Sequence, residues 1–581
     1  MLLRSSTLLL FSVLLGGCVT QQSQPIPVVA AAEQPEGDAA PRDEGWRSED
    51  LPNVDLSADL MFRILAGDIA AQREQPGLAA KSWLDLARRT HDPRIARRAL
   101  ELSLNIGQPQ LAQEAAQIWV ETAPQSLLAK QILISLLIRA NRLKEVEPYI
   151  PAFLKAPQRE LAAFYLQLHL LWTPKADPVQ VARLTGLLTA GQDKMPEARF
   201  ARAVMHAGQA QDAAAIAELD AALKLRPWWE QAVLYKAQLL AQRTPPDAAF
   251  DYLREAISKN PMQQVYSLTL ARMLNEASRP AEARAVYEAI LAQHPEQVEA
   301  QVGVGLLALQ SRDFDVAYQM FFSALNHGAG NGNLLRYYLG QIDEERHRPS
   351  EALAWYRQVE GDENRAALER IPRVLARMGE RDAAIKALAD VPAVTEAEKI
   401  QKIQIEGQVW RELKEPLHGY EVLTKGIAQF PDAVDLYYDR SLIADLLHKQ
   451  AEGEADLRHV LQMQPDNVMA LNALGYVLAN RTDRLAEAET LLTQALAAEP
   501  DNAVIIDSMG WLRFHQGRLK EAVDLLGKAY GKMPDPEIAA HYAEALWKSG
   551  EQAKARSVLD AALKLDPTHD VLLETRKRLG L

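Results

Sequence analysis

The sequence has only one cysteine, Cys18, among its 581 residues. A single thiol cannot form an intramolecular disulfide, so no covalent cross-link within the chain stabilises its fold. It cannot build a thiolate zinc site either, because such a site needs two to four sulfur ligands or a set of nearby histidines. The role of this one thiol must therefore depend on the sequence around Cys18.

Positive charge and long hydrophobic runs are also scarce. The 64 Lys and Arg residues face 77 Asp and Glu residues, so the formal net charge is -13. Nucleic-acid binding needs a surplus of Lys and Arg to neutralise phosphates, so this balance argues against such a ligand. After the start of the chain, no hydrophobic run reaches the roughly 20 residues that a membrane-spanning helix needs.

Motifs for catalysis and for metal or phosphate binding are missing as well. The twelve histidines never fall three to five residues apart, whereas zinc sites on helices take ligands at i and i+4. The sequence contains no GxxxxGK[ST] loop and no GxSxG elbow. The acidic run Asp343-Glu344-Glu345, followed by Arg346, is interpreted as a solvated helix face. We predict a protein that is not an enzyme and has no metal or cofactor; an enzyme with an unrecognised site is the alternative.

The first residues have the three parts of an export signal. Arg4 is the positive start, the segment 8–15 is a short apolar run, and Leu15-Gly16-Gly17 is a small-residue cleavage site. The motif Leu-Gly-Gly-Cys resembles the lipobox of bacterial lipoproteins, which are cut before the cysteine and then acylated on it. This resemblance implies a lipoprotein signal peptide over residues 1–17 and a lipidated Cys18. An ordinary secretory signal with a chance cysteine is the alternative.

The residues after the cysteine indicate where the anchor would hold the protein. Val19, rather than Asp, follows Cys18, and by resemblance to Gram-negative lipoproteins this implies the outer membrane, with the chain facing the periplasm. Residues 18–56 are rich in Pro, Ala, Gln and acids and have no apolar period, which predicts a disordered tether.

From residue 57 to the end, apolar residues recur at i, i+3, i+4 and i+7 in stretches of 12 to 15 residues, which is typical of helices. Prolines at 227, 261 and 295, and at 431, 465, 500, 534 and 567, recur at intervals of 33 to 35 residues. Small residues recur with them, because paired helices approach closely only where the facing residues are small. One such set is Gly305, Gly340, Gly407, Gly475 and Gly510; the other is Ala215, Ala249, Ala283, Ala317, Ala352, Ala488, Ala522 and Ala555.

This 34-residue pattern resembles the tetratricopeptide repeat (TPR), a pair of helices that stacks on its neighbours. The resemblance implies an all-α superhelical solenoid of about 14 or 15 helix hairpins. We predict divergent TPR-like hairpins over residues 57–192, the main TPR array over residues 193–567, and a closing helix over residues 568–581. Whether the divergent hairpins form one stack with the rest is left open.

The first helix of each pair lines the inner face of TPR arrays, where ligands bind. On that face we expect aromatic and amide residues at i, i+4 and i+7 spacing, which mark a protein-binding surface. The candidates are Tyr337, Gln341, Tyr438, Asn472, Tyr476, Asp507, Trp511, Phe514 and Trp547. Packing against the next repeat is the alternative role of each ring. The polar residues among these candidates are acids and amides rather than Lys or Arg, which argues against a Lys/Arg clamp for a carboxylate.

Lipobox and TPR array together resemble the outer-membrane lipoproteins that serve carboxyl-terminal processing proteases. The resemblance implies an adaptor that binds such a serine protease, activates it and presents cell-wall (peptidoglycan) hydrolases for degradation. It supplies no docking residues. A scaffold for assembling outer-membrane proteins, a secretion system or polysaccharide export is the alternative.

Overall fold

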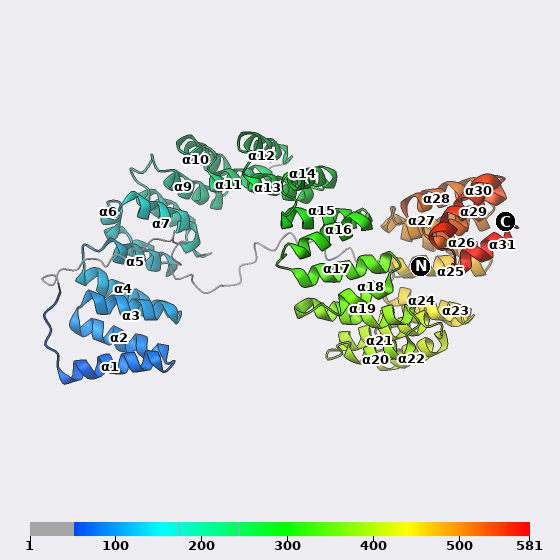
Figure 1. Ribbon diagram of the computed structural model, residues 1–581, viewed down its shortest axis with the longest axis horizontal. Coiled ribbons are helices and arrows are strands. Elements are labelled where there is room, and N and C mark those ends of the chain that lie inside the picture. Colours follow the sequence, from blue (N-terminus) through cyan, green and yellow to red (C-terminus); the bar gives the residue numbers. More distant parts are fainter. Residues whose placement is uncertain (1–50, 174, 243–244) are drawn as a thin grey trace. The chain divides into compact units, whose positions relative to one another are not determined.

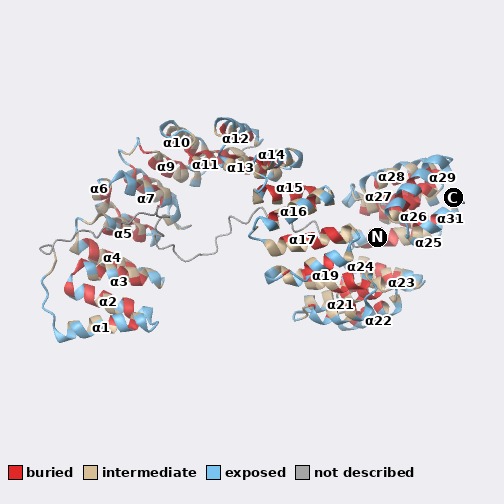
Figure 2. Cartoon of the chain, in the orientation of Figure 1, coloured by how far each residue is buried: buried red, intermediate tan, exposed pale blue. Residues whose placement is uncertain are grey.

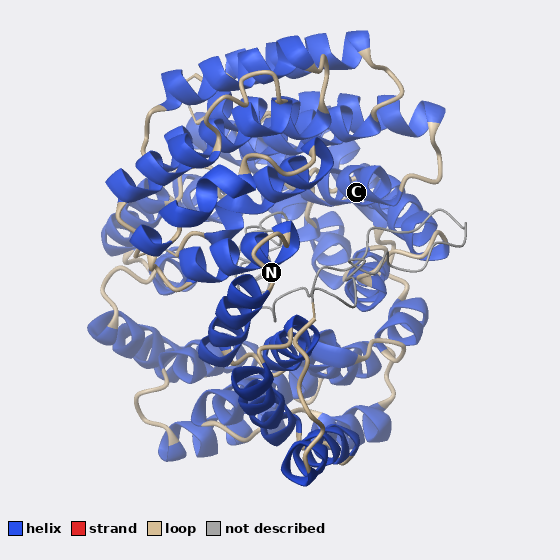
Figure 3. Ribbon diagram, turned by 90° about the vertical axis from the view of Figure 1, so that its left-hand side faces the viewer, coloured by secondary structure: helices blue, strands red, loops and turns tan. Residues whose placement is uncertain are grey.

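The computed structural model describes residues 51–173, 175–242 and 245–581, and these residues form helices and loops without any strand (Figure 3). The predicted export signal, the lipidated Cys18 and most of the predicted tether lie outside the described residues. None of the helices that the structure describes is long and apolar enough to span a bilayer.

The chain divides into two compact units, which meet in sequence between Gln293 and His294 (Figure 1). The first unit contains α1 Ala58–Gln72, α2 Pro76–Thr90, α3 Pro93–Asn105, α4 Pro109–Thr122, α5 Leu127–Arg139, α6 Ile150–Phe153, α7 Gln158–Leu171, α8 Pro178–Leu188, α9 Pro196–Gly208, α10 Asp212–Leu225, α11 Glu230–Ala241, α12 Asp247–Lys259, α13 Gln264–Glu276 and α14 Pro280–Gln293. Short 3-10 turns at Leu143–Glu145 and Glu147–Tyr149 lead into α6.

The second unit contains α15 Val298–Gln310, α16 Phe314–Asn326, α17 Gly332–Glu345, α18 Pro349–Tyr356, α19 Asn364–Arg377, α20 Arg381–Ala387, α21 Glu396–Glu412, α22 Pro416–Gln429, α23 Val434–Leu446, α24 Gln450–Met463, α25 Val468–Arg481, α26 Leu485–Ala498, α27 Ala503–His515, α28 Leu519–Lys532, α29 Pro536–Ser549, α30 Gln552–Leu565 and α31 Asp570–Arg578. Further 3-10 turns lie at Gly361–Glu363 and Leu388–Asp390.

The 31 described helices form 15 successive pairs, and α31 is left at the end. The fold is therefore a TPR-type solenoid, and the predicted count of 14 or 15 hairpins is confirmed. The prolines mark its period: Pro227, Pro465 and Pro534 each lie two residues after the last residue of α10, α24 and α28. Proline cannot donate the next helical hydrogen bond and disfavours helix just before it, so each one separates two hairpins.

The recurring small residues lie where the two helices of a hairpin meet. A Cβ atom added to Gly340 would lie 2.5 Å from the ring of Tyr356, and one on Gly510 would lie 2.8 Å from Leu526. The eight recurring alanines of the second helices are fully buried. Figure 2 shows the same pattern, with buried residues on the sides of the helices that face other helices. Larger side chains at these positions would push the helices apart.

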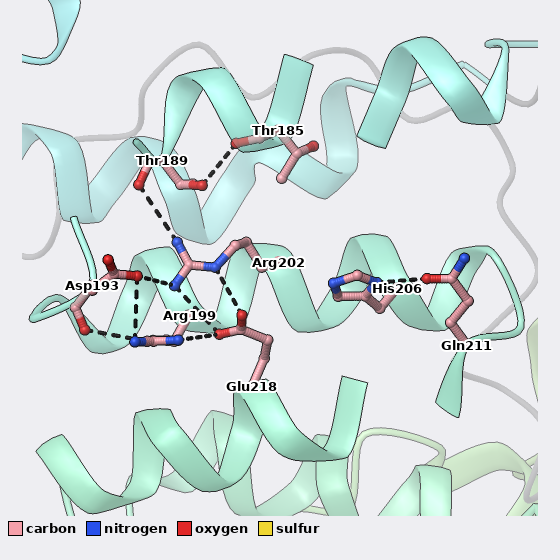
Figure 4. A network of polar contacts seen from close by, with 8 residues as sticks. All are labelled: Thr185, Thr189, Asp193, Arg199, Arg202, His206, Gln211 and Glu218. Atoms are coloured by element: carbon pink, nitrogen blue, oxygen red, sulfur yellow. Dashed lines mark hydrogen bonds and ion pairs between the residues drawn. The ribbon is translucent and has the colours of Figure 1, made fainter. Parts of the chain in front are cut away.

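The core of the first unit continues across residue 192. One hydrophobic cluster contains both Leu184 of α8 and Ala198 of α9. Polar contacts cross the same point (Figure 4): Arg202 of α9 donates to the Thr189 carbonyl at 3.5 Å and pairs with Glu218 of α10 at 3.1 Å. The divergent hairpins and the first hairpin after residue 192 are therefore packed as one stack within this unit.

Candidate protein-binding face

The first helices of the pairs contact one another along the second unit. Contacts join α17 to α19, α19 to α21 and α21 to α23, and further along they join α25 to α27 and α27 to α29. We call this layer of first helices the A-helix face. All nine candidates predicted from the sequence lie on its helices: two on α17, one on α23, two on α25, three on α27 and one on α29.

Four of the candidates meet in one group with His541, which the sequence reasoning did not single out. The Trp511 ring stacks between Phe514 and His541, with centroid distances of 4.6 and 4.1 Å. His541 Nδ1 lies 3.0 Å from Asp507 Oδ2, and its Nε2 lies 3.4 Å from the Tyr476 hydroxyl. We call these five residues the ring cluster; they join α25, α27 and α29.

Within the ring cluster, the buried histidine has an altered pKa. Burial disfavours the charged form of His541, but the Asp507 carboxylate outweighs this effect and raises the pKa of His541. Trp511 Nε1 donates to Asn480 at 3.2 Å. Each polar atom of the imidazole and indole thus has a partner from a neighbouring first helix. These contacts lock adjacent repeats together.

The candidates differ in how much surface they present. Asp507, Asn472, Trp511 and Tyr438 are buried, with exposed fractions of 1 to 7%. In this structure these four side chains pack between repeats. The other candidates, Tyr337, Gln341, Tyr476, Phe514 and Trp547, are only partly buried. Partner binding by any of the nine residues remains a prediction.

The upstream candidates Tyr337 and Gln341 belong to a charged network. Gln341 Nε2 lies 3.2 Å from the Tyr337 hydroxyl, and Arg370 Nε donates to the same hydroxyl at 3.1 Å. Arg370 and Arg377 of α19 pair with the two oxygens of Glu344 at 2.9 and 3.0 Å. We call Glu344, Arg370, Arg373 and Arg377 the arginine cluster.

The interpretation of Asp343 and Glu344 as part of a solvated face was wrong. The Asp343 side chain is 1% exposed and accepts a hydrogen bond from Trp355 Nε1 at 3.1 Å, while the Glu344 side chain is 7% exposed. Burial acts to raise the pKa of Glu344, but the charge of Arg370, the Tyr356 hydroxyl and Arg377 lower it overall. Local sequence could not show this, because the cations come from α19, about 30 residues later.

The expectation that the inner face bears acids and amides instead of Lys and Arg was also wrong. Arg370, Arg373 and Arg377 follow one another at i, i+3 and i+7 on α19, and Arg411 lies on α21. The spacing was available in the sequence. Pro372 lies between the first two arginines, inside α19, although proline normally breaks a helix.

A neighbouring carboxyl group has an altered titration. Asp439 of α23 accepts a hydrogen bond from Gln404 at 2.8 Å. Burial raises the pKa of Asp439 to about 6, although Gln404 and the charge of Arg411 act in the opposite direction. No group of three or more His, Cys, Asp and Glu residues within the described ranges could hold a metal ion.

Comparison with known proteins identifies the repeats. Tetratricopeptide repeat family models match residues 268–325, 447–503 and 513–574. The TPR repeat-containing protein PA4667 of Pseudomonas aeruginosa is 29% identical over 613 residues, which cover 99% of this chain and 96% of that protein. The chain is thus a TPR repeat protein, similar to this relative along nearly its whole length.

Solved TPR proteins resemble parts of the chain. A tetratricopeptide repeat protein from Parabacteroides merdae aligns with a TM-score of 0.31 and 16% identity, covering 49% of this chain and 99% of its own. A thermophilic TPR protein of Thermus thermophilus aligns with a TM-score of 0.29 and 18% identity, covering 31% and 97%.

Proposed function

We propose that this protein is a non-enzymatic, lipid-anchored scaffold that binds protein partners along its A-helix face. The observation that carries the proposal is the packing of first helices in two runs, α17 to α23 and α25 to α29, on which partly buried aromatic and arginine side chains lie. Such residues are enriched in protein interfaces, and repeat arrays offer extended surfaces rather than enclosed catalytic pockets.

The finer proposal concerns the partners and the compartment. We propose that a carboxyl-terminal processing serine protease binds this scaffold in the periplasm, and that cell-wall hydrolases are brought to it for degradation. Support comes from the lipobox before Cys18 combined with the repeat array, which resembles the lipoproteins that serve such proteases. A scaffold for outer-membrane protein assembly, a secretion system or polysaccharide export is the second candidate.

Capture of partners from the native envelope tests this proposal. Tagged full-length protein, purified from detergent-solubilised membranes, is expected to recover a processing protease, and adding the scaffold should accelerate cleavage of a cell-wall hydrolase by that protease. Recovery of a secretin or a polysaccharide-export complex without a protease would support the second candidate. Turnover of a substrate by the scaffold alone, abolished by a point substitution, would contradict both.

The anchor has its own test. Cys18→Ser is expected to release the protein from membranes without changing its helix content, because acylation of the sulfur is lost while the repeats are untouched. Confinement to a membrane raises effective concentrations without new contacts, so the variant should also function less well in cells. Membrane fractionation and circular dichroism are the measurements; a variant that still sediments with the outer membrane contradicts the anchor.

A further inference from the structure

The first helix of the structure, α1, exposes an apolar face, and most of its residues are exposed (Figure 2). Four large apolar side chains, which we call the α1 stripe, lie along one side of this helix at i, i+1, i+4 and i+8 spacing: Met61, Phe62, Leu65 and Ile69. Their exposed fractions are 47 to 70%. The other side of α1 packs on α2 through the small buried residues Gly67 and Ala70, and a Cβ atom on Gly67 would lie 2.9 Å from Trp83 Nε1.

The first and last described helices differ in what they expose. The end repeats of a solenoid need a polar outer face, because no further repeat covers them. The last helix, α31, meets this requirement, since Leu573 is its one exposed large apolar residue and the other exposed residues are charged: Asp570, Glu574, Arg576, Lys577 and Arg578. The α1 stripe does not meet it. A contiguous apolar face of this kind at the end of an array marks an interaction surface.

The charged residues near the α1 stripe indicate how its partner is recognised. Arg63 pairs with Asp59 at 2.9 Å and with Asp85 of α2 at 2.8 Å, and Arg89 pairs with the same Asp85 at 3.0 Å. Asp68, an acid, adjoins the stripe. The stripe itself contains no cation, so attraction to an anionic partner does not explain it. Its partner must be recognised by apolar contact.

The place of α1 in the sequence selects the occupant. The helix begins at Ala58, 40 residues after Cys18. If residues 18–56 form the predicted coil, their root-mean-square length is about 35 Å, so an acylated Cys18 keeps α1 close to the bilayer. The bilayer is then present at a high effective concentration, whereas a second copy or another protein must be met by diffusion. A weakly binding apolar face is therefore occupied by lipid first.

We propose that the α1 stripe lies on the lipid bilayer that holds Cys18, with its side chains inserted between the lipid headgroups. Helices in the membrane interface bury an apolar face about 5–10 Å deep, and α1 is not long and apolar enough to span the bilayer. Four half-exposed side chains gain little by insertion, which agrees with the release expected for Cys18→Ser. The contact would hold the array by its first helix and leave the later repeats free for partners. The inference rests on the anchor in the proposed function.

A quencher carried by the lipid tests this contact. Cys18 is the only cysteine in the sequence, so once it is acylated an introduced cysteine is the one free thiol for a fluorescent label. Gln72→Cys places the label on α1, seven residues after Leu65 and on the same side of the helix. The full-length acylated protein is reconstituted in phosphatidylcholine vesicles that contain doxyl-labelled phosphatidylcholine. We expect quenching at least threefold stronger than for a label at Val179→Cys of α8, a position as exposed as Phe62.

Substitutions in the stripe distinguish insertion from proximity. In the protein labelled at position 72, Phe62→Asp with Leu65→Asp should reduce quenching to the level found at position 179, because charged side chains do not enter the lipid. The matched control, Leu170→Asp with Val179→Asp, replaces two similarly exposed apolar residues and should leave quenching unchanged. Equal quenching at the two labelled positions, or no effect of the stripe variant, overturns the inference. A marked fall in the melting temperature of the stripe variant would mean that the stripe is core and contradicts it as well.

Other occupants and a failure of the anchor give different results. Energy transfer between labels that rises with protein density, without quenching by doxyl lipid, would indicate a second copy on the stripe and contradict the inference. A change in the label that requires the captured envelope partner would indicate a protein and contradict it too. If mass spectrometry shows that Cys18 is not acylated, the anchor in the proposed function fails and the inference fails with it. If Cys18 is acylated and the label at position 72 is not quenched, the inference alone fails.

Discussion

The A-helix face contains two buried charge pairs of different chemistry. Between α17 and α19, Glu344 is shared by Arg370 and Arg377, whereas between α27 and α29, Asp507 faces His541. Arginine keeps its proton at any ordinary pH, but histidine can release its proton near neutrality. The layer of first helices therefore holds one contact that is insensitive to pH near neutrality and one that pH can weaken. The following substitutions test this contrast.

The largest effect is expected for Glu344→Gln. The substitution leaves two guanidinium groups without their shared carboxylate, and breaking a buried pair in this way costs about 3–5 kcal/mol. Urea unfolding and hydrogen exchange of peptides from α17 and α19 measure the loss, which should be nearly constant between pH 6 and 9. Glu345→Gln is the control, because Glu345 pairs with Arg312 nearer the surface and such pairs contribute about 0–1 kcal/mol. Equal losses for both variants would contradict the burial of the network.

A smaller, pH-dependent effect is expected for Asp507→Asn. The pKa of His541 is raised in the folded protein, so the pair stabilises fully below the ordinary pKa of histidine and loses this contribution as pH rises through the folded value. We expect the free energy of unfolding of the variant to be lower than that of the wild type by about 1–3 kcal/mol at pH 6, and by less at pH 9. Hydrogen exchange of α27 and α29 at both pH values measures it. A loss that is equal at the two pH values would mean that His541 is neutral in the wild type at both.

Asp439→Asn should increase stability, whereas the two preceding substitutions reduce it. Burial raises the pKa of Asp439 to about 6, so its charged form is unfavourable and the wild type loses stability as pH rises through that value. Asparagine keeps an acceptor for Gln404 without the charge. The variant should be more stable than wild type by about 1–2 kcal/mol at pH 8, since one pKa unit corresponds to ~1.4 kcal/mol, and equally stable at pH 4. Urea unfolding at the two pH values measures this, and equal stability at pH 8 would contradict the raised pKa.

The sequence predicted the hairpins well because their determinants are local and repeated. Each small residue acts within one hairpin and each proline acts at the junction of two, so a 34-residue period reveals them without knowledge of the fold. The burial and the pairing of side chains on the A-helix face were predicted less well, because they depend on contacts between helices about 30 residues apart. From its neighbours in the sequence, Glu344 is expected on the surface, but Arg370 of α19 pairs with it. Trp511 is likewise expected to be exposed, but His541 of α29 stacks on its ring.

The turns inside the hairpins provide the last and smallest contrast. His448, between α23 and α24, has a left-handed backbone with φ of 57°, whereas Gly517 has the equivalent place between α27 and α28 with φ of 74°. This conformation costs a residue with a Cβ about 1–2 kcal/mol, and glycine avoids most of that cost. His448→Gly should therefore stabilise the protein by about 0.5 kcal/mol, after the larger entropy of glycine in the unfolded chain is allowed for.

The reverse substitution, Gly517→Ala, makes the comparison symmetrical. A Cβ on Gly517 would contact nothing within 4 Å, so only the backbone conformation opposes it, and we expect a loss of about 1 kcal/mol. Urea unfolding of both variants, with hydrogen exchange of the flanking helices, measures the two shifts. Shifts of the same sign would show that side-chain contacts, rather than the left-handed backbone, determine the stability of these turns.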